Sequence, residues 1–324
     1  MKYTELGNSG IKVSRICVGC MSFGDTASNF HAWTLDYERS KEMIKHALDL
    51  GINFFDTANN YSAGTSEIFL GKALKELGVN RKDVVIASKV YFNDGKLSKD
   101  AIFREIDATL KKLDMDYLDL YQIHRFDYDT PIEETMEALN ELIKMGKVRA
   151  IGASSMFGYQ FHNMQVVAEQ HGWAKFSTMQ NHYNLLYRED ERDLIPVCEQ
   201  YGVTLIPYSP LAGGHLSRHE WESDTLRGKT DKVRQAKYDK EKENNMQIID
   251  RVHELASKHD VSMSQIALAW LLAKGANPIV GCTKPHHYDD AVKSLDLELS
   301  KEEISYLEEP YKAHELTGLV LKPR

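Results

Sequence analysis

The chain has 324 residues, of which 42% are hydrophobic, enough for one large domain or two of ordinary size. Forty Lys and Arg residues against 48 Asp and Glu residues give a net charge of −8, which argues against nonspecific nucleic-acid binding and a polybasic membrane anchor. No apolar run approaches the roughly 20 residues that span a bilayer, and residues 1–7 lack the apolar core of a signal peptide. We therefore expect a cytoplasmic protein that has neither a membrane nor a nucleic acid as a partner.

The predicted elements begin with a small hairpin over residues 3–14 and continue with eight strands. Each strand is a short run rich in β-branched and aromatic residues, and segments with helical periodicity separate the runs. The strands are predicted at residues 16–20, 52–55, 84–88, 118–123, 148–153, 177–181, 203–208 and 277–281. No linker-like composition interrupts the eight β-then-α units, so we predict one domain over residues 1–324 with an α/β fold. A (β/α)₈ barrel, typically about 250 residues, fits this pattern. An open doubly wound sheet is disfavoured because no G-x-G-x-x-G motif follows the first strand.

The intervening segments carry ordinary helix signals. Residues 40–48 and 132–145 place apolar side chains at helical spacing. Ser98 is a typical N-cap residue, and Pro131 is expected at a first helical position. Gly146 is a typical residue just beyond a helix C-terminus.

One connection is unusually long. A polar, charged stretch over residues 215–245 follows the seventh strand. A loop of this length in a compact domain is usually functional or poorly ordered. Because it follows a barrel strand, we expect it at the catalytic rim as a lid over a bound ligand, with a flexible surface insertion as the alternative.

The four cysteines do not suggest a metal or redox site. Cys17 and Cys20 form a C-x-x-C spacing, but residues three apart in a strand point to opposite faces. No second C-x-x-C follows, so a structural role is favoured over metal binding.

Four polar side chains follow three successive predicted strands. Asp56 comes directly after the second strand with Tyr61 five residues later, and Lys89 and His124 follow the third and fourth strands. The carboxyl ends of barrel strands converge on one rim, where chemistry takes place. A carboxylate, a phenol, an ammonium and an imidazole at that rim predict a proton-donating site. Any one of these residues alone would be expected to have a structural role.

These residues carry a family resemblance. Residues 53–61, 87–90 and 121–125 resemble the aldo-keto reductases, in particular the NADP-dependent, potassium-channel β-subunit-like branch, and the resemblance covers nearly the whole chain. It implies a TIM barrel with an N-terminal hairpin and a long loop after the seventh strand. It also implies that Asp56, Tyr61, Lys89 and His124 are the catalytic tetrad, with Tyr61 as the general acid.

The tetrad has a physical logic for carbonyl reduction. A free phenol has a pKa of about 10 and is a weak acid near neutrality. A nearby Lys89 ammonium is expected to lower the pKa of Tyr61, and Asp56 would keep that ammonium charged and oriented. A neutral His124 would hydrogen-bond the substrate oxygen.

The resemblance extends to a cofactor site in the second half of the chain. It implies that Ser154, Ser155 and Gln180 contact the nicotinamide carboxamide, although Ser155 stands where the family usually has Asn. A serine hydroxyl replaces an amide that offers both a donor and an acceptor, which weakens this contact.

The segment over residues 207–214 resembles the part of the family that holds the nicotinamide and the pyrophosphate. Tyr208 would stack on the nicotinamide ring. Ser209, Leu211 and Gly213 would bring backbone amides close to phosphate.

The last predicted strand precedes a helix that begins near residue 285. In the family this region binds the adenosine 2′-phosphate, so Thr283 and Lys284 favour NADPH, with NADH as the alternative cofactor. His287 and Asp290 fall where the family often places adenine contacts. Ala291 replaces a common Asn.

The sequence therefore predicts an enzyme that reduces small aldehydes or ketones with NADPH, and a homo-oligomer is compatible with it. The alternative is a cofactor-sensing regulatory subunit with the same fold and little turnover, because fold alone does not separate the two. A barrel glycosidase would need a second rim carboxylate, and this hypothesis is disfavoured. Aromatic candidates for the substrate pocket lie in rim loops, and they are Phe23, Trp33, Tyr91 and Phe126.

Overall fold

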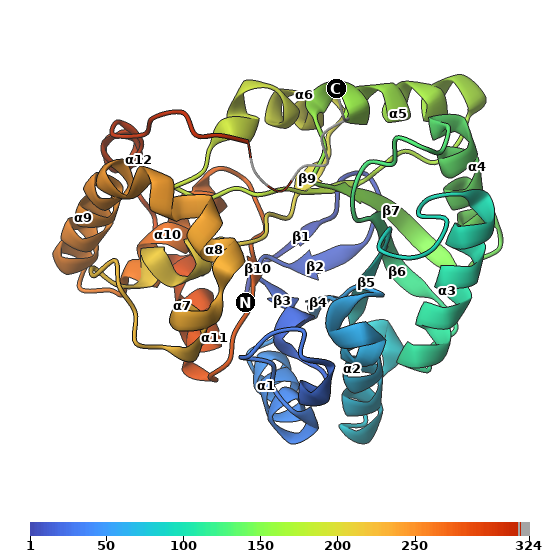
Figure 1. Ribbon diagram of the computed structural model, residues 1–324, viewed down its shortest axis with the longest axis horizontal. Helices are drawn as coiled ribbons and strands as arrows, with labels where there is room; N and C mark the ends of the chain where they lie inside the picture. The colour runs from blue at the N-terminus through green and yellow to red at the C-terminus, as the bar shows by residue number, and fades with distance from the viewer. Residues whose placement is uncertain (317, 319–324) are drawn as a thin grey trace.

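The computed structural model describes residues 1–316 and residue 318, and its centre is a sheet of eight parallel strands surrounded by helices (Figure 1). The strand order is β10-β3-β4-β5-β6-β7-β8-β9, so neighbours in the sheet follow one another along the chain, except that the last strand, β10, pairs with the first, β3. Backbone hydrogen bonds also join β9 and β10, the two strands at the ends of this order, and so close the barrel. Asn277 N donates to Leu205 O at 2.9 Å, and Ile279 N donates to Pro207 O at 3.0 Å. The predicted (β/α)₈ fold is confirmed.

Every barrel strand overlaps the strand predicted from the sequence. The strands are β3 (Cys17–Gly19), β4 (Phe54–Asp56), β5 (Val85–Val90), β6 (Leu118–Ile123), β7 (Val148–Ser154), β8 (Thr178–Gln180), β9 (Thr204–Leu205) and β10 (Ile279–Val280). Alternate side chains face the barrel interior and the helices, as the two-residue period of a strand requires. In β4, Phe54 packs in the interior cluster and Phe55 in the outer core.

The N-terminal hairpin covers one end of the barrel. It pairs β1 (Tyr3–Glu5) with β2 (Lys12–Ser14) in antiparallel register. Its buried side chains pack against interior side chains that begin the barrel strands, among them Cys17, Phe54 and Val85. The amino ends of the strands are therefore closed by apolar packing, which leaves the carboxyl ends for a ligand site.

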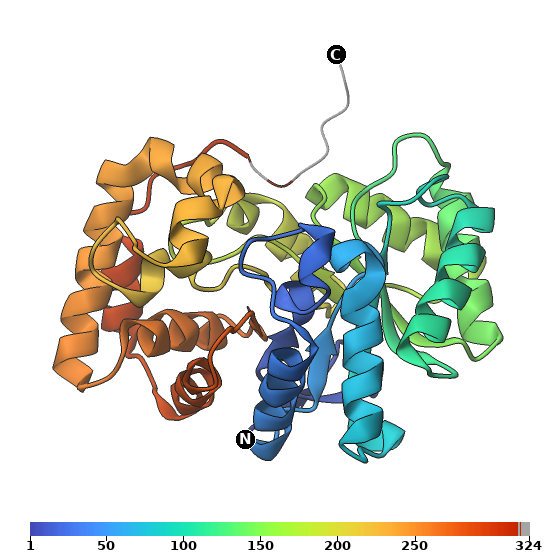
Figure 2. The same ribbon diagram turned by 60° about the horizontal axis from the view of Figure 1, so that its bottom comes forward.

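Helices pack around the strands, as the two views show (Figures 1 and 2). They are α1 (Tyr37–Asp49), α2 (Thr65–Glu76), α3 (Lys99–Leu113), α4 (Ile132–Lys144), α5 (Gly158–His171), α6 (Leu194–Gln200), α9 (Lys242–His259), α10 (Met263–Ala273), α11 (His286–Lys293) and α12 (Lys301–Glu308). Ser98 caps α3 as predicted, whereas Pro131 is the N-cap of α4 and not its first helical residue. None of the described helices combines the length and apolar character needed to cross a membrane.

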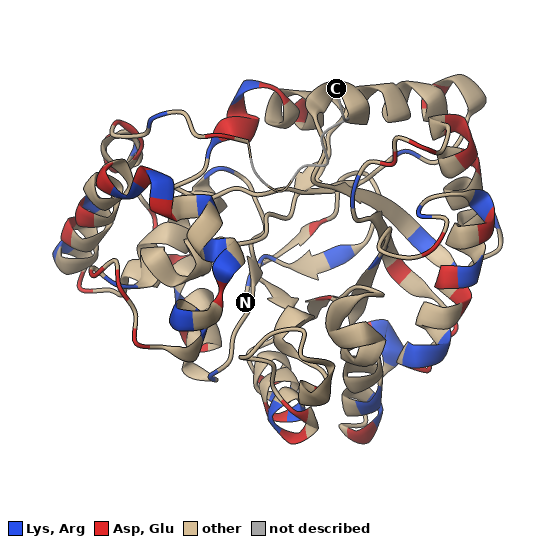
Figure 3. Ribbon diagram, viewed as in Figure 1, with Lys and Arg blue, Asp and Glu red and all other residues tan. Residues whose placement is uncertain are grey.

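The long connection after β9 is partly helical, which the sequence analysis did not anticipate. It contains α7 (Leu226–Thr230) and α8 (Lys232–Tyr238), and both carry basic side chains drawn blue in Figure 3. Local capping explains these helices, because the side chains of Thr225 and Asp231 accept backbone hydrogen bonds at their starts. The Arg227 guanidinium lies 5.1 Å from the ring centre of Trp33, so the segment contacts the loop after β3.

The barrel interior leaves no room for a side chain at Gly152. A Cβ there would lie 2.2 Å from Thr178 Oγ1 and 3.1 Å from Gln122 Cγ. We expect Gly152→Ala to lower the free energy of unfolding by about 1–3 kcal/mol through overpacking, measured by urea unfolding. Gly281→Ala is the matched control, because its Cβ would meet only Gly19 O at 4.0 Å. Equal stability of the two variants would contradict this account.

Candidate active site

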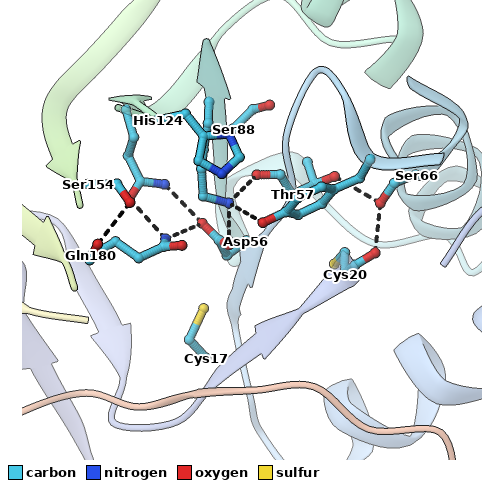
Figure 4. Close-up of polar contacts among 12 residues, drawn as sticks. Cys17, Cys20, Asp56, Thr57, Ser66, Ser88, His124, Ser154 and Gln180 are labelled. Carbon is cyan, nitrogen blue, oxygen red and sulfur yellow. Dashed lines mark hydrogen bonds and ion pairs between the residues drawn. The ribbon is translucent and has the colours of Figure 1, made fainter. Parts of the chain in front are cut away.

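The carboxyl ends of β4, β5 and β6 bring the predicted tetrad together. Asp56 ends β4, Lys89 lies in β5 and His124 directly follows β6. Tyr61 begins a 3₁₀ turn (η3, Tyr61–Gly64) after β4. Figure 4 shows Asp56 and His124 near one another, with the side chain of Gln180 extending to Asp56.

The Lys89 ammonium is the centre of the site. It is fully buried. It donates to Asp56 Oδ2 at 2.7 Å, to Thr57 O at 2.8 Å and to Tyr61 OH at 3.1 Å. An ammonium has three donors, so all of them are used. This geometry fixes the phenol, the ammonium and the carboxylate in one chain of contacts.

Lys89 is charged in this environment. Burial acts to lower the pKa of Lys89, but the charge of Asp56 and the contact with Tyr61 raise it, and the net shift is upward. A buried charge is stable only when it is paired and hydrogen-bonded. Asp56 therefore has the role predicted for it, as the partner that keeps the ammonium charged.

Lys89 acts to lower the pKa of Tyr61 as predicted, but burial outweighs its effect. Burial raises the pKa of Tyr61, and this exceeds the lowering caused by Lys89, so the pKa lies above its usual value. The ammonium alone would lower the pKa of Tyr61, but desolvation of the phenolate disfavours the charged form. Tyr61 is consequently a neutral phenol near neutral pH, with Lys89 placed to stabilise the phenolate once a proton has left.

His124 is a neutral imidazole beside the phenol. Its ring centre lies 5.9 Å from that of Tyr61, edge to face. Burial lowers the pKa of His124 well below the usual range, and the positive charges of Lys89 and Arg125 lower it further. Its buried Nδ1 has no hydrogen-bond partner among the described residues. The ring can therefore contribute a hydrogen bond to a ligand without carrying a charge.

Two glutamine amides complete the surroundings of Asp56. Gln122 Nε2 and Gln180 Nε2 each donate to Asp56 Oδ1 at 2.9 Å, and Gln180 Nε2 also lies 3.1 Å from Gln122 Oε1. The sequence analysis assigned no role to Gln122. Its signal is the position on β6, because it is two residues from Leu120, which packs in the barrel interior, and an apolar residue is expected on that face.

Hydrogen bonds next to the turn that carries Tyr61 stabilise that turn. Ser62 and Ala63 have positive φ angles of 47° and 55°. Ser66 Oγ, in the first turn of α2, lies 2.9 Å from Thr57 Oγ1 and donates to Cys20 O at 2.8 Å, as Figure 4 shows. These contacts hold an otherwise unfavourable backbone conformation in place, and so position Tyr61.

The residues assigned to the nicotinamide carboxamide lie together at the ends of β7 and β8. Ser154 Oγ donates to Gln180 O at 2.8 Å and lies 3.2 Å from Ser155 Oγ. Ser155 has a positive φ of 51°. The three side chains are therefore close to one another and, through Gln180, to Asp56.

The segment after β9 forms a tight backbone cradle. Ser209, Ala212, Gly213 and Gly214 all have positive φ angles, from 49° to 100°. Tyr208 is half-buried, and its ring is parallel to that of His182, with 5.3 Å between ring centres. Leu211 precedes a 3₁₀ turn over Ala212–Ser217.

Two arginines at this cradle were missed by the sequence analysis. The side chain of Arg234 packs against Gly213, where an added Cβ would lie 2.6 Å from Arg234 Cγ. Arg218 Nη1 donates to Gly214 O at 2.8 Å. Arg234 Nε and Nη1, together with Arg218 Nε and Nη2, are buried without a hydrogen-bond partner among the described residues. Unsatisfied buried guanidinium donors beside a tight loop indicate a site for an anion.

The residues assigned to the adenosine end lie at the start of α11. Lys284 is exposed and Thr283 half-buried, both just before the helix. His287 is half-buried; burial, followed by His286 and Lys284, lowers its pKa. Asp290 Oδ1 accepts a hydrogen bond from Gln265 Nε2 at 3.0 Å, so it already joins α11 to α10.

The predicted substrate aromatics differ in their surroundings. Phe23 is fully buried in the main hydrophobic core and presents no surface to a ligand. Trp33 stacks on His31 with 4.3 Å between ring centres, and Tyr91 and Phe126 contact Phe92 and Tyr128 edge to face. The exposed aromatic closest to the tetrad is one not predicted, Phe92, whose ring centre lies 5.0 Å from that of His124.

A model of the Aldo/keto reductase family matches residues 15–312. The chain belongs to this family. It is 43% identical to the versiconal hemiacetal acetate reductase of Aspergillus parasiticus, over 96% of this chain and 97% of that protein. It is 41% identical to the aldo-keto reductase AMT2 of Alternaria alternata, over 98% and 93%. A solved structure of a thermostable aldo-keto reductase with the inhibitor epalrestat has a TM-score of 0.78 and 30% identity, covering 96% of this chain and 100% of that one.

The aldo-keto reductase described here is accordingly an oxidoreductase. Members of the family act on small carbonyl compounds and generally use a nicotinamide cofactor. The assignment to the potassium-channel β-subunit-like branch stays a prediction.

A buried histidine next to the arginines predicts a pH-dependent stability. His215 is fully buried, and burial, followed by Arg234 and Arg218, lowers its pKa to about 3. The unfolded chain binds a proton below about pH 6.5, while the folded protein does not, so stability is lost as the pH falls below that value. We expect the unfolding free energy of wild type, minus that of His215→Phe, to fall by about 2 kcal/mol from pH 6.5 to 5.

Urea unfolding at a series of pH values gives this difference directly. His219→Phe is the matched control, because the His219 side chain is 46% exposed. An unchanged difference for His215→Phe across the range would show that His215 titrates normally.

Proposed function

We propose that this aldo-keto reductase reduces aldehydes or ketones to alcohols with NADPH, and that Tyr61 is the general acid. The observation that carries the proposal is the contact of the half-buried Tyr61 OH with the fully buried Lys89 Nζ at 3.1 Å, beside a neutral His124. Carbonyl reduction needs a hydride for the carbon and a proton for the oxygen. Bound NADPH would supply the hydride.

The chain's own residues account for the proton. Tyr61 is protonated near neutral pH, so its O–H can donate to the carbonyl oxygen. The resulting phenolate lies against the Lys89 ammonium, which is held by Asp56. His124 presents its neutral ring to the same oxygen. Donors placed where negative charge develops lower the barrier because they need no reorganisation during the reaction.

The residues present fit a dinucleotide with phosphates. Arg218 and Arg234 hold unsatisfied donors beside Gly213 and Gly214, which suits a pyrophosphate. Ser154, Ser155 and Gln180 would hold the carboxamide, and Tyr208 would stack on the nicotinamide. Ser209 and Leu211 lie in the same cradle. Thr283 and Lys284 would bind the 2′-phosphate, with His287 beside the adenine. Asp290 would contact the cofactor only if its hydrogen bond with Gln265 were broken.

Removing the Tyr61 hydroxyl tests whether Tyr61 is the general acid. We expect Tyr61→Phe to reduce kcat for small aldehydes by about 10²–10⁴-fold, the usual contribution of general acid catalysis. Turnover is followed by the loss of NADPH absorbance, and cofactor binding by fluorescence titration. Tyr159→Phe, at a 58% exposed position, is the matched control.

Undiminished turnover in Tyr61→Phe would exclude Tyr61 as the acid. Tight NADPH binding by the wild-type protein without reduction of any carbonyl would instead favour a cofactor-sensing regulatory subunit.

Two substitutions distinguish the residues proposed to bind the 2′-phosphate from those proposed to bind the pyrophosphate. Lys284→Ala is expected to weaken NADPH binding roughly tenfold while leaving NADH binding nearly unchanged, since a hydrogen bond to a charged group contributes about 1.5–3 kcal/mol. Arg234→Met is expected to weaken both cofactors alike, because the pyrophosphate is common to both. Equal weakening of NADH and NADPH by Lys284→Ala would contradict the 2′-phosphate assignment.

A further inference from the structure

Two side chains beside the tetrad have no role in the chemistry described above. Phe92 follows β5 and Arg125 follows His124, so both lie in loops at the catalytic end of the barrel. Phe92 is 48% exposed, unusual for a large aromatic side chain next to buried catalytic groups. An exposed apolar ring at the edge of an active site is a surface available for a ligand.

Arg125 and Phe92 form a cation–π pair beside His124. The Phe92 ring centre lies 5.0 Å from the His124 ring centre, edge to face. The Arg125 guanidinium lies 5.6 Å from the same Phe92 ring centre. The Phe92 ring is therefore a neighbour of both the imidazole and the cation. The Phe30 ring centre lies 6.0 Å from that of Tyr61.

The charge of Arg125 is not neutralised by the protein. Its Nη1 donates to the backbone carbonyl of His124 at 2.6 Å. No carboxylate of the described residues lies within ion-pair distance of its guanidinium. The two acids that follow it are engaged elsewhere: Asp127 accepts from Leu97 N at 3.2 Å and Thr130 Oγ1 at 2.7 Å, and Asp129 pairs with Lys96 at 2.5 Å.

The positive charge of Arg125 is felt inside the site. It contributes to lowering the pKa of His124 and opposes the rise in the pKa of Tyr61 that burial causes. Arg125 therefore acts on the same region as the reacting groups, and it differs from Arg218 and Arg234, which lie at the loop after β9. A cation here would attract negative charge on a carbonyl substrate and would leave the cofactor's phosphates to the other arginines.

Resting on the proposed function, we propose that this enzyme prefers aromatic aldehydes that carry a carboxylate, with Arg125 binding the carboxylate and Phe92 packing against the ring. A guanidinium that lies over an aromatic ring still presents several N–H donors, which match a carboxylate in bidentate geometry. The carbonyl lies at Tyr61 and His124, and the carboxylate lies across Phe92. Arg125 is thus a residue that determines specificity.

A matched pair of substrates tests the assignment. The carboxylate substrate is para-carboxybenzaldehyde, and its methyl ester is the neutral counterpart with the same ring and aldehyde. The quantity measured is the ratio of kcat/KM for the acid to kcat/KM for the ester, with NADPH, in wild type, Arg125→Met, Arg125→Lys and Arg39→Met. Arg39 is an exposed arginine of α1 and serves as the charge-matched control. Because the comparison is a ratio, general damage to the site cancels.

We expect wild type to prefer the acid at least tenfold at low salt, with the preference shrinking at high salt. Arg125→Met is expected to lose at least tenfold of the ratio, Arg125→Lys to keep part of it, and Arg39→Met to stay within about twofold of wild type. A wild-type ratio near one, or an unchanged ratio in Arg125→Met, would overturn the assignment while leaving the reductase function intact.

Calorimetric measurement of the binding of the two aldehydes, in the presence of NADP⁺, distinguishes a failure of the proposed reductase function from a failure of the carboxylate site. If neither aldehyde is reduced, the proposed function fails, yet tighter binding of the acid that disappears in Arg125→Met would still support the carboxylate site. Equal binding of acid and ester by wild type would overturn it.

Discussion

The buried ammonium of Lys89 is the constraint on which the rest of the site depends. A charge without solvent must be fully hydrogen-bonded, and Lys89 meets this requirement with Asp56, Thr57 O and Tyr61 OH. The barrel provides these partners because consecutive strands place their carboxyl ends side by side. Gln122 and Gln180 then satisfy the other carboxylate oxygen of Asp56. Each partner is fixed by the next, so the distance between the phenol and the ammonium follows from packing inside the barrel.

The cations at the open end of the barrel fall into separate groups with different surroundings. Lys89 is neutralised within the protein, which suits a group that stabilises a phenolate. Arg218 and Arg234 keep buried donors without partners among the described residues, which suits the phosphates of a cofactor. Arg125 lies over the Phe92 ring beside the reacting groups. The overall charge of −8 does not reveal this arrangement.

Much of the fold could be predicted from the sequence because strand runs and helix caps are local signals. The eight strands follow from apolar runs such as residues 118–123, and the tetrad from polar residues that end those runs. The parts missed depend on tertiary contacts. Burial reverses the expected pKa shift of Tyr61, Phe23 turns into the core, and the caps Thr225 and Asp231 make helices in a stretch without long apolar periodicity.

The most direct test of the account is a titration of Tyr61 in the free enzyme, followed by the NMR shift of its labelled ring carbon next to oxygen. The signal is assigned by its loss in Tyr61→Phe. The account predicts that Tyr61 remains a phenol throughout the range from pH 6 to about 10, the ordinary pKa of tyrosine, and that Lys89→Met delays its ionisation further. Ionisation of Tyr61 near neutral pH would contradict it, because the Lys89 ammonium would then dominate over burial.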